Sequence, residues 1–173
     1  TQLHEKVARA AAGLRRFGVG PGDRVAAFLP NGPEAVVGML ATTSLGAIWS
    51  SCSPDFGVAG VLDRFGQIAP KVLIATAGYR YAGRHIDTTG TVQQLVAQLP
   101  GLAAVVGVGD LPGSILWAEL TATPAALEFH AAPFDYPLYI LYSSGTTGPP
   151  KGIVHGAGGT LLQHLKEHLL HTD

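Results

Sequence analysis

A run of hydroxyl residues, glycines and one lysine follows an apolar segment in the last quarter of the chain. The run reads Tyr142-Ser143-Ser144-Gly145-Thr146-Thr147-Gly148-Pro149-Pro150-Lys151-Gly152. Glycines let backbone N–H groups approach an anion closely, and successive N–H groups can form an anion-binding concavity. Serine and threonine add hydroxyl donors and oxygen atoms suited to Mg²⁺, and Lys151 adds a mobile positive charge. Together these groups predict a loop that binds a polyphosphate.

The spacing within this run differs from that of the Walker A loop. A Walker A motif places four residues between its first glycine and its Gly-Lys pair. Gly145 and Gly148 are too close for that pattern, and Pro150 takes the place of the second glycine. No serine or threonine follows Lys151. The run is therefore not typical of a P-loop NTPase, and a strand-to-helix turn without a ligand is the alternative interpretation.

Alternating helical and strand patterns precede this run and must position it. Apolar residues recur at helical spacing from Gln2 to Phe17, and a β-rich segment follows at 24–29. The remaining predicted elements are helices at 33–44 (with Asn31 as N-cap), 58–68 and 91–99, and strands at 47–50, 71–75, 103–108 and 138–142. The alternation indicates an α/β domain with a mostly parallel sheet and helices on both faces. The stretches 77–89 and 109–137 are expected to be irregular, without a domain boundary.

Composition narrows the possible classes of function. The net charge of −1 provides no basic surface for nucleic acid or membrane lipids, and no apolar run approaches the roughly 18 residues of a membrane span. The only cysteine, Cys52, has no internal disulfide partner, which favours a reducing, cytoplasmic location. Charged residues make up 13% of the chain, against about 25% in an average soluble domain. With a start at Thr1 that reads like the middle of a helix, this sparse charge leads us to expect part of a longer protein.

The run from Ser144 to Gly152 resembles the phosphate-binding signature of the adenylate-forming superfamily, which includes acyl-CoA synthetases, luciferases and peptide-synthetase adenylation domains. Other segments are similar to one branch of it, the acetoacetyl-CoA synthetases. The resemblance extends over nearly the whole chain, and its most similar segments lie at 44–51, 53–57, 62–65, 67–68 and 157–168.

This resemblance implies an acid–thiol ligase. ATP, acetoacetate and coenzyme A would give acetoacetyl-CoA, AMP and diphosphate through an acyl-adenylate. The resemblance implies no catalytic residue within the chain and no protein metal site, but it places the ATP phosphates, with Mg²⁺, on Ser143, Ser144, Gly145, Thr146, Thr147, Gly148 and Lys151.

The same resemblance implies that residues 1–173 are part of the large AMP-binding domain, truncated after the phosphate loop. The adenine pocket and the small C-terminal domain would lie elsewhere in the protein, so we expect the chain alone to be inactive. Two alternatives stay open: another short-chain acyl-CoA synthetase, acting on acetate, propionate or butyrate, and a nucleotide-binding module without catalysis.

A second resemblance concerns coenzyme A. The stretch Tyr81-Ala82-Gly83-Arg84 is similar to one that contacts coenzyme A phosphates in acetyl-CoA synthetases. Gly83 and Arg84 match that pattern, whereas Tyr81 stands where those relatives carry a basic residue. A solvated loop arginine is the alternative for Arg84.

The other candidate residues favour structural roles. His164, His168 and His171 have helical spacing, but they lie beside an apolar stripe and lack a completing ligand, so no metal site is expected. His155 could approach an acyl pocket or could serve in packing. The remaining residues are expected in the core (Cys52, Trp49 and Trp117) or in capping and surface positions (Asp55 and Asp63).

Overall fold

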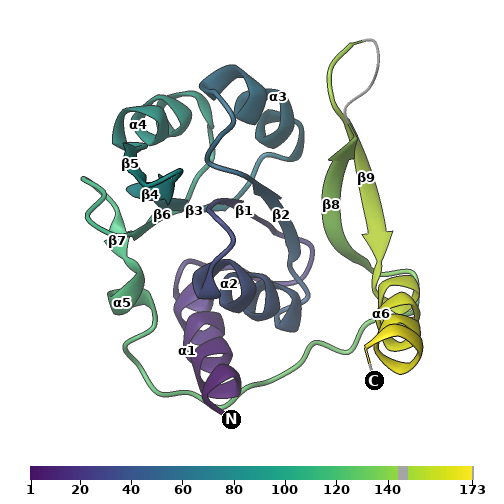
Figure 1. The fold of residues 1–173 in the computed structure, drawn as a ribbon. Helices are drawn as coiled ribbons and strands as arrows, with labels where there is room; N and C mark the ends of the chain where they lie inside the picture. The colour runs from purple at the N-terminus through teal and green to yellow at the C-terminus, as the bar shows by residue number, and fades with distance from the viewer. Residues whose placement is uncertain (144–147, 173) are drawn as a thin grey trace.

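Helices cover both faces of a mostly parallel sheet in the computed structural model, which describes residues 1–143 and 148–172 (Figure 1). Within these residues, seven strands form one sheet in the order β7-β6-β3-β1-β2-β8-β9. The pairs from β7 through to β8 are parallel, and β9 runs antiparallel to β8 at the edge. The predicted α/β class is therefore confirmed.

The described helices are α1 (Gln2–Arg16), α2 (Pro33–Ser44), α3 (Val58–Ile68), α4 (Thr89–Gln98), α5 (Trp117–Leu120) and α6 (Ala157–His171). The strands of the sheet are β1 (Arg24–Phe28), β2 (Ile48–Cys52), β3 (Val72–Thr76), β6 (Ala104–Val108), β7 (Ile115–Leu116), β8 (Pro137–Ser143) and β9 (Lys151–Gly156). A separate two-stranded hairpin consists of β4 (Gly78–Tyr81) and β5 (Arg84–Asp87).

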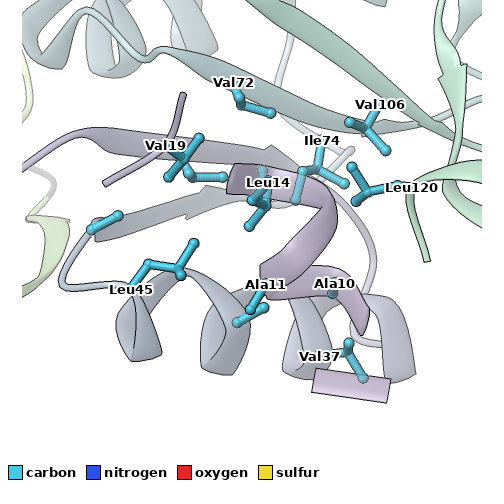
Figure 2. Packing of buried hydrophobic residues seen from close by; sticks show 14 of the residues in the cluster. Ala10, Ala11, Leu14, Val19, Val37, Leu45, Val72, Ile74, Val106 and Leu120 are labelled. Carbon is cyan, nitrogen blue, oxygen red and sulfur yellow. The ribbon is translucent and has the colours of Figure 1, made fainter. Parts of the chain in front are cut away.

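The central strand β1 sends alternate side chains into two cores. Val25 and Ala27 belong to a core shared with α1, α2 and α5. Ala26 and Phe28 belong to the other core, which α3 and α4 cover. All four side chains are fully buried, as expected for a parallel strand that has helices on both sides. Figure 2 shows the first core, where residues of α1 and α2 pack against β3 and β6.

The predicted elements of the core match the structure closely. The helix predicted at 58–68 has the observed bounds of α3, and each predicted strand overlaps an observed strand. The predicted N-cap of α2 was wrong, because Gly32, in an extended conformation, takes that position instead of Asn31. The prediction of irregular structure was also wrong in two places: β4 and β5 form a hairpin within 77–89, and β7 and α5 interrupt 109–137.

Helix α6 follows β9 directly and lies at the base of the hairpin β8–β9, at the end opposite the 143–151 loop (Figure 1). It buries none of its residues, and its leucines are exposed: Leu161, Leu162, Leu165, Leu169 and Leu170. None of the helices that the structure describes combines the length and the apolar character of a membrane span.

Candidate functional site

The predicted phosphate-binding residues that the structure describes lie at the end of the hairpin β8–β9. Ser143, the last residue of β8, pairs directly with Lys151, the first residue of β9. Both residues are exposed, as is Gly148, whose φ of 97° lies in the left-handed region that favours glycine. Ser144, Gly145, Thr146 and Thr147 lie outside the described residues. The structure thus brings a hydroxyl donor and a cation together at the two ends of the 143–151 loop.

The hairpin is fixed to the sheet by strand β2. Tyr139 of β8 pairs with Trp49 of β2, and the Ser50 hydroxyl donates a hydrogen bond of 2.7 Å to the carbonyl of Ile140. Ser50 is fully buried, so this bond is sheltered from water. The 143–151 loop therefore extends from a strand that continues the parallel sheet, at the carboxyl ends of the strands. In open α/β sheets, ligands bind at this edge.

Helix α3 contacts both ends of the same loop. The Tyr142 hydroxyl donates to the carbonyl of Arg64 at 2.6 Å, and Gln67 Nε2 donates to the carbonyl of Pro150 at 2.9 Å. Partial burial raises the pKa of Tyr142, with Cys52 as a smaller contribution, so its hydroxyl keeps the proton that it donates. These contacts were not predicted from the sequence, because they join residues 78 and 83 positions apart.

A second concave region lies beside the carboxyl ends of β1 and β2. This cavity, here called the β1–β2 cavity, has a volume of about 290 Å³ and is bordered by Asn31, Ser51, Asp55, Tyr79 and Arg80 among others. Its lining combines hydroxyl, amide, carboxylate and guanidinium groups. Such a mixture can hold a polar ligand in one orientation.

Asp55 joins two borders of the β1–β2 cavity. Its carboxylate accepts hydrogen bonds from the Tyr79 hydroxyl at 2.5 Å and from the Ser53 hydroxyl at 2.7 Å. These bonds, the one from Tyr79 first, lower the pKa of Asp55. Asp55 thus connects the loop before α3 to the hairpin β4–β5. This arrangement agrees with the surface role predicted for it.

The predicted coenzyme A residues lie at the tip of the hairpin β4–β5. Ala82 and Gly83 form its two-residue turn with φ values of 48° and 78°, and Arg84 pairs with Tyr81 across the strands. Gly83 and Arg84 are exposed and do not border the β1–β2 cavity, whereas Arg80 does. Arg80 was not predicted as a site residue, because residues 77–89 were expected to be irregular. The Ala82-Gly83 turn gave little signal, because two-residue hairpin turns favour asparagine, aspartate or glycine where this one has Ala82.

Cys52 and the two tryptophans occupy the core to different extents. Cys52 is buried, and this burial raises the pKa of its thiol to about 11, so it is a poor nucleophile at neutral pH. Trp49 is buried as predicted, whereas Trp117 is only partly buried against the first core.

The histidines lie on exposed surface. His164, His168 and His171 are exposed along α6, and His155 is exposed on β9 opposite Tyr139, so it packs against none of the described core. Asp63 is also exposed, and its carbonyl accepts from Gln67 within α3. Within residues 1–143 and 148–172, no three His, Cys, Asp or Glu side chains gather to hold a metal ion.

Comparison with known proteins gives consistent matches along the whole chain. Residues 1–171 match the family model described as AMP-binding enzyme. The chain is 52% identical to acetoacetyl-coenzyme A synthetase from Rhizobium meliloti (strain 1021) and 48% identical to acetoacetyl-CoA synthetase from Macaca fascicularis, each over 98% of this chain. It spans only 28% of the length of either relative. The solved acetoacetyl-CoA synthetase from Streptomyces lividans superposes with a TM-score of 0.95 at 49% identity, covering 99% of this chain and 27% of that one.

Proposed function

Since the chain belongs to the AMP-binding enzyme family, we propose that its 143–151 loop binds the phosphates of ATP in an acetoacetate–CoA ligase. The observation that carries the proposal is the placement of Ser143 opposite Lys151, within a chain about half identical to acetoacetyl-CoA synthetases along its whole length. In this reaction the acetoacetate carboxylate attacks the α-phosphate of ATP and diphosphate leaves. The thiol of coenzyme A then attacks acetoacetyl-AMP and displaces AMP.

The loop's contribution to the first step is positioning and charge neutralisation. Phosphoryl and adenylyl transfer develop charge on phosphate oxygens, and fixed donors that face those oxygens stabilise the transition state. Ser143 and Lys151 supply a hydroxyl donor and a positive charge from opposite strands, and Ser144, Gly145, Thr146, Thr147 and Gly148 complete the proposed set. The hydroxyl-rich composition of the loop fits Mg²⁺, which prefers oxygen ligands and would neutralise phosphate charge when bound.

Coenzyme A is proposed to meet the hairpin β4–β5. Arg84 at the hairpin tip and Arg80 at the border of the β1–β2 cavity supply two positive charges on one hairpin, suited to a phosphorylated ligand. Gly83 would let the backbone turn approach that ligand closely. The proposed coenzyme A residues are therefore Gly83 and Arg84, as predicted from the sequence, together with Arg80.

Residues 1–173 are proposed to form part of the large AMP-binding domain, acting with further chain that supplies the adenine pocket and the small C-terminal domain. Acetoacetate, ATP and coenzyme A would be the partners, without nucleic acid or membrane. A cytoplasmic, reducing location is part of the proposal, supported by the single buried thiol of Cys52.

The test is carried out on the complete gene product. We expect acetoacetate-dependent exchange of diphosphate into ATP, thioester formation with coenzyme A, and a higher kcat/KM for acetoacetate than for acetate, propionate or butyrate. A higher value for one of the other acids would identify another short-chain acyl-CoA synthetase instead. Nucleotide binding without exchange for any acid would identify a binding module.

A further inference from the structure

The two ends of the 143–151 loop are held by one face of helix α3. Tyr142 immediately precedes Ser143 in β8, and Pro150 immediately precedes Lys151 in β9. Their contacts on α3 are Arg64 and Gln67, which are three residues apart and therefore lie on the same side of the helix. The residues adjacent to the proposed phosphate ligands thus share one support.

Both hydrogen bonds run from a side-chain donor, the Gln67 amide or the Tyr142 hydroxyl, to a backbone carbonyl. Gln67 Nε2 carries two hydrogens, one for the Asp63 carbonyl within α3 at 2.5 Å and one for the Pro150 carbonyl at 2.9 Å. The bond within the helix orients the amide toward the strand. The Tyr142 hydroxyl has one hydrogen, which it donates to the Arg64 carbonyl.

The side chain of Arg64 also contacts Tyr142, at the face of its ring. Its guanidinium donates to the Gly60 carbonyl at 2.6 Å and lies 4.4 Å from the ring centroid of Phe56 and 5.9 Å from that of Tyr142. A guanidinium at such distances is attracted to the faces of both rings. The Tyr142 ring therefore contacts α3 through its hydroxyl and through its face.

Helix α3 is itself a rigid support. Val61 and Phe65, on the face of α3 toward the sheet, are completely buried in the core between the sheet and the helices α3 and α4. Packed cores resist small displacements, because each shift opens voids or creates clashes. The position of Arg64 and Gln67 relative to the sheet is consequently fixed, and they can transmit that fixed position to the hairpin.

We propose that Gln67 and Arg64 are positioning residues for the ATP-dependent half-reaction, keeping Ser143 and Lys151 at the separation that a polyphosphate requires. They act through Tyr142 and Pro150. This inference rests on the proposed function of the loop. Since diphosphate has left before the thioester forms, loss of the support should impair the use of ATP and spare the second half-reaction.

The first test variant is Gln67→Glu in the complete gene product, which keeps the size of the side chain and removes its ability to donate at neutral pH. The matched control is Gln98→Glu. Gln98 is also an exposed glutamine in the last turn of its helix, and its Nε2 also donates to the carbonyl four residues before it, at 3.2 Å, but among the described residues it contacts no strand through a hydrogen bond. Both substitutions add a negative charge at a helix C-terminus, so helix-dipole effects are alike in the two variants.

For Gln67→Glu we expect the KM for ATP in acetoacetate-dependent exchange to rise at least threefold to tenfold, about the size of one lost hydrogen bond, and repulsion between the new carboxylate and the ATP phosphates adds to this rise. Thioester formation from preformed acetoacetyl-AMP should stay within about twofold of wild type, as should both half-reactions of Gln98→Glu. Tyr142→Phe, with Tyr139→Phe as its control, should change the KM for ATP in the same direction. If Gln67→Glu lowers the Tm more than Gln98→Glu does, its KM change does not separate a positioning role from a structural defect. In that case the KM for ATP of Tyr142→Phe tests the positioning role.

An unchanged KM for ATP in both test variants would overturn the inference, as would equal losses in the two half-reactions, which indicate a general structural defect. The wild-type arm separates this outcome from a failure of the proposed function. If the wild-type gene product shows no acid-dependent exchange, the proposed function is wrong and the positioning role is overturned with it.

Discussion

The Tyr79 hydroxyl donates a hydrogen bond to the carboxylate of Asp55, which joins the hairpin β4–β5 to the loop that leads into α3. One partner thus lies on the hairpin proposed to meet coenzyme A, and the other lies three residues before the start of the helix that supports the 143–151 loop. The two proposed binding regions are connected through α3 and its preceding loop.

We predict that Tyr79→Phe raises the pKa of Asp55 toward its ordinary value of 3.8, because the Tyr79 hydroxyl is the first cause of the lowered pKa. A lowered folded-state pKa means that the contact stabilises the fold at pH above the ordinary carboxyl value and loses this effect as pH falls through the lowered value. An NMR titration of the Asp55 side-chain carbon measures the shift. Tyr81→Phe is the control, and an unchanged Asp55 titration in Tyr79→Phe contradicts the assignment.

Lys151→Ala in the complete gene product should slow adenylation about 10²-fold, the lower end of the range for losing one donor that faces developing charge. Lys151 is exposed, and solvent screens its charge. Rapid-quench measurement of acetoacetyl-AMP formation tests the first step, and thioester formation from preformed acetoacetyl-AMP should be little affected. The control is Lys166→Ala, which removes an exposed lysine of α6, away from the 143–151 loop. Equal losses in both steps would remove Lys151 from the phosphate-binding set.

Replacing Arg84 or Arg80 by alanine should raise the KM for coenzyme A about tenfold, the size of a lost charge-assisted hydrogen bond, and leave the KM for ATP unchanged. Steady-state kinetics with each substrate varied in turn provides the measurement. Arg15→Ala, at an exposed arginine of α1 that pairs with Glu128, is the control. An effect for Arg80 alone would place the coenzyme A phosphates at the β1–β2 cavity instead of the hairpin tip.

Cys52 should resist alkylation in the folded protein. Burial raises the pKa of its thiol from 9.0 to about 11, so its thiolate fraction near pH 8 is roughly a hundredfold lower than in the unfolded chain. Peptide mapping after iodoacetamide treatment, with and without denaturant, measures the difference. The raised pKa also means that Cys52 does not change the free energy of unfolding below about pH 9. Between about pH 9 and pH 11 only the unfolded thiol ionises, so the contribution of Cys52 lowers the free energy of unfolding as pH rises. Equal labelling with and without denaturant would show that the thiol is accessible.

The elements predicted correctly are those in which burial dictates the pattern. The strands at β1 and β3 are short apolar runs, and their burial on both faces follows directly from that composition. The hairpin β4–β5 was missed because Arg80, Tyr81 and Arg84 show no apolar alternation, and its turn uses Ala82 at positive φ, where asparagine or glycine is the usual signal. Strand β9 was missed for a similar reason, since all but its last residue are exposed.

The candidate site was predictable in its chemistry and not in its support. Hydroxyls, glycines and Lys151 in one run predict a polyphosphate ligand from residue types alone. That Ser143 pairs with Lys151 follows from strand register, which depended on recognising β9. The contacts of Gln67 with Pro150 and of Tyr142 with Arg64 depend on where α3 lies relative to the sheet edge, and no local pattern contains that information.

The pairing of β8 with β2 predicts an order of folding. Strands β1, β2 and β3 join through crossovers within residues 24–76, whereas the Ser50–Ile140 bond closes a separation of 90 residues. Distant contacts form at a greater loss of chain entropy, so we expect the short crossovers to assemble first and the hairpin β8–β9 to dock afterwards onto an existing sheet edge. During synthesis, about eighty residues follow β2 before β8 emerges. Until β8 pairs with it, the edge of β2 has unpaired backbone N–H and C=O groups that could pair with another chain. Pulsed hydrogen-exchange labelling during refolding of the complete gene product should detect protection in β1 and β3 before protection in β8, and simultaneous protection would contradict this order.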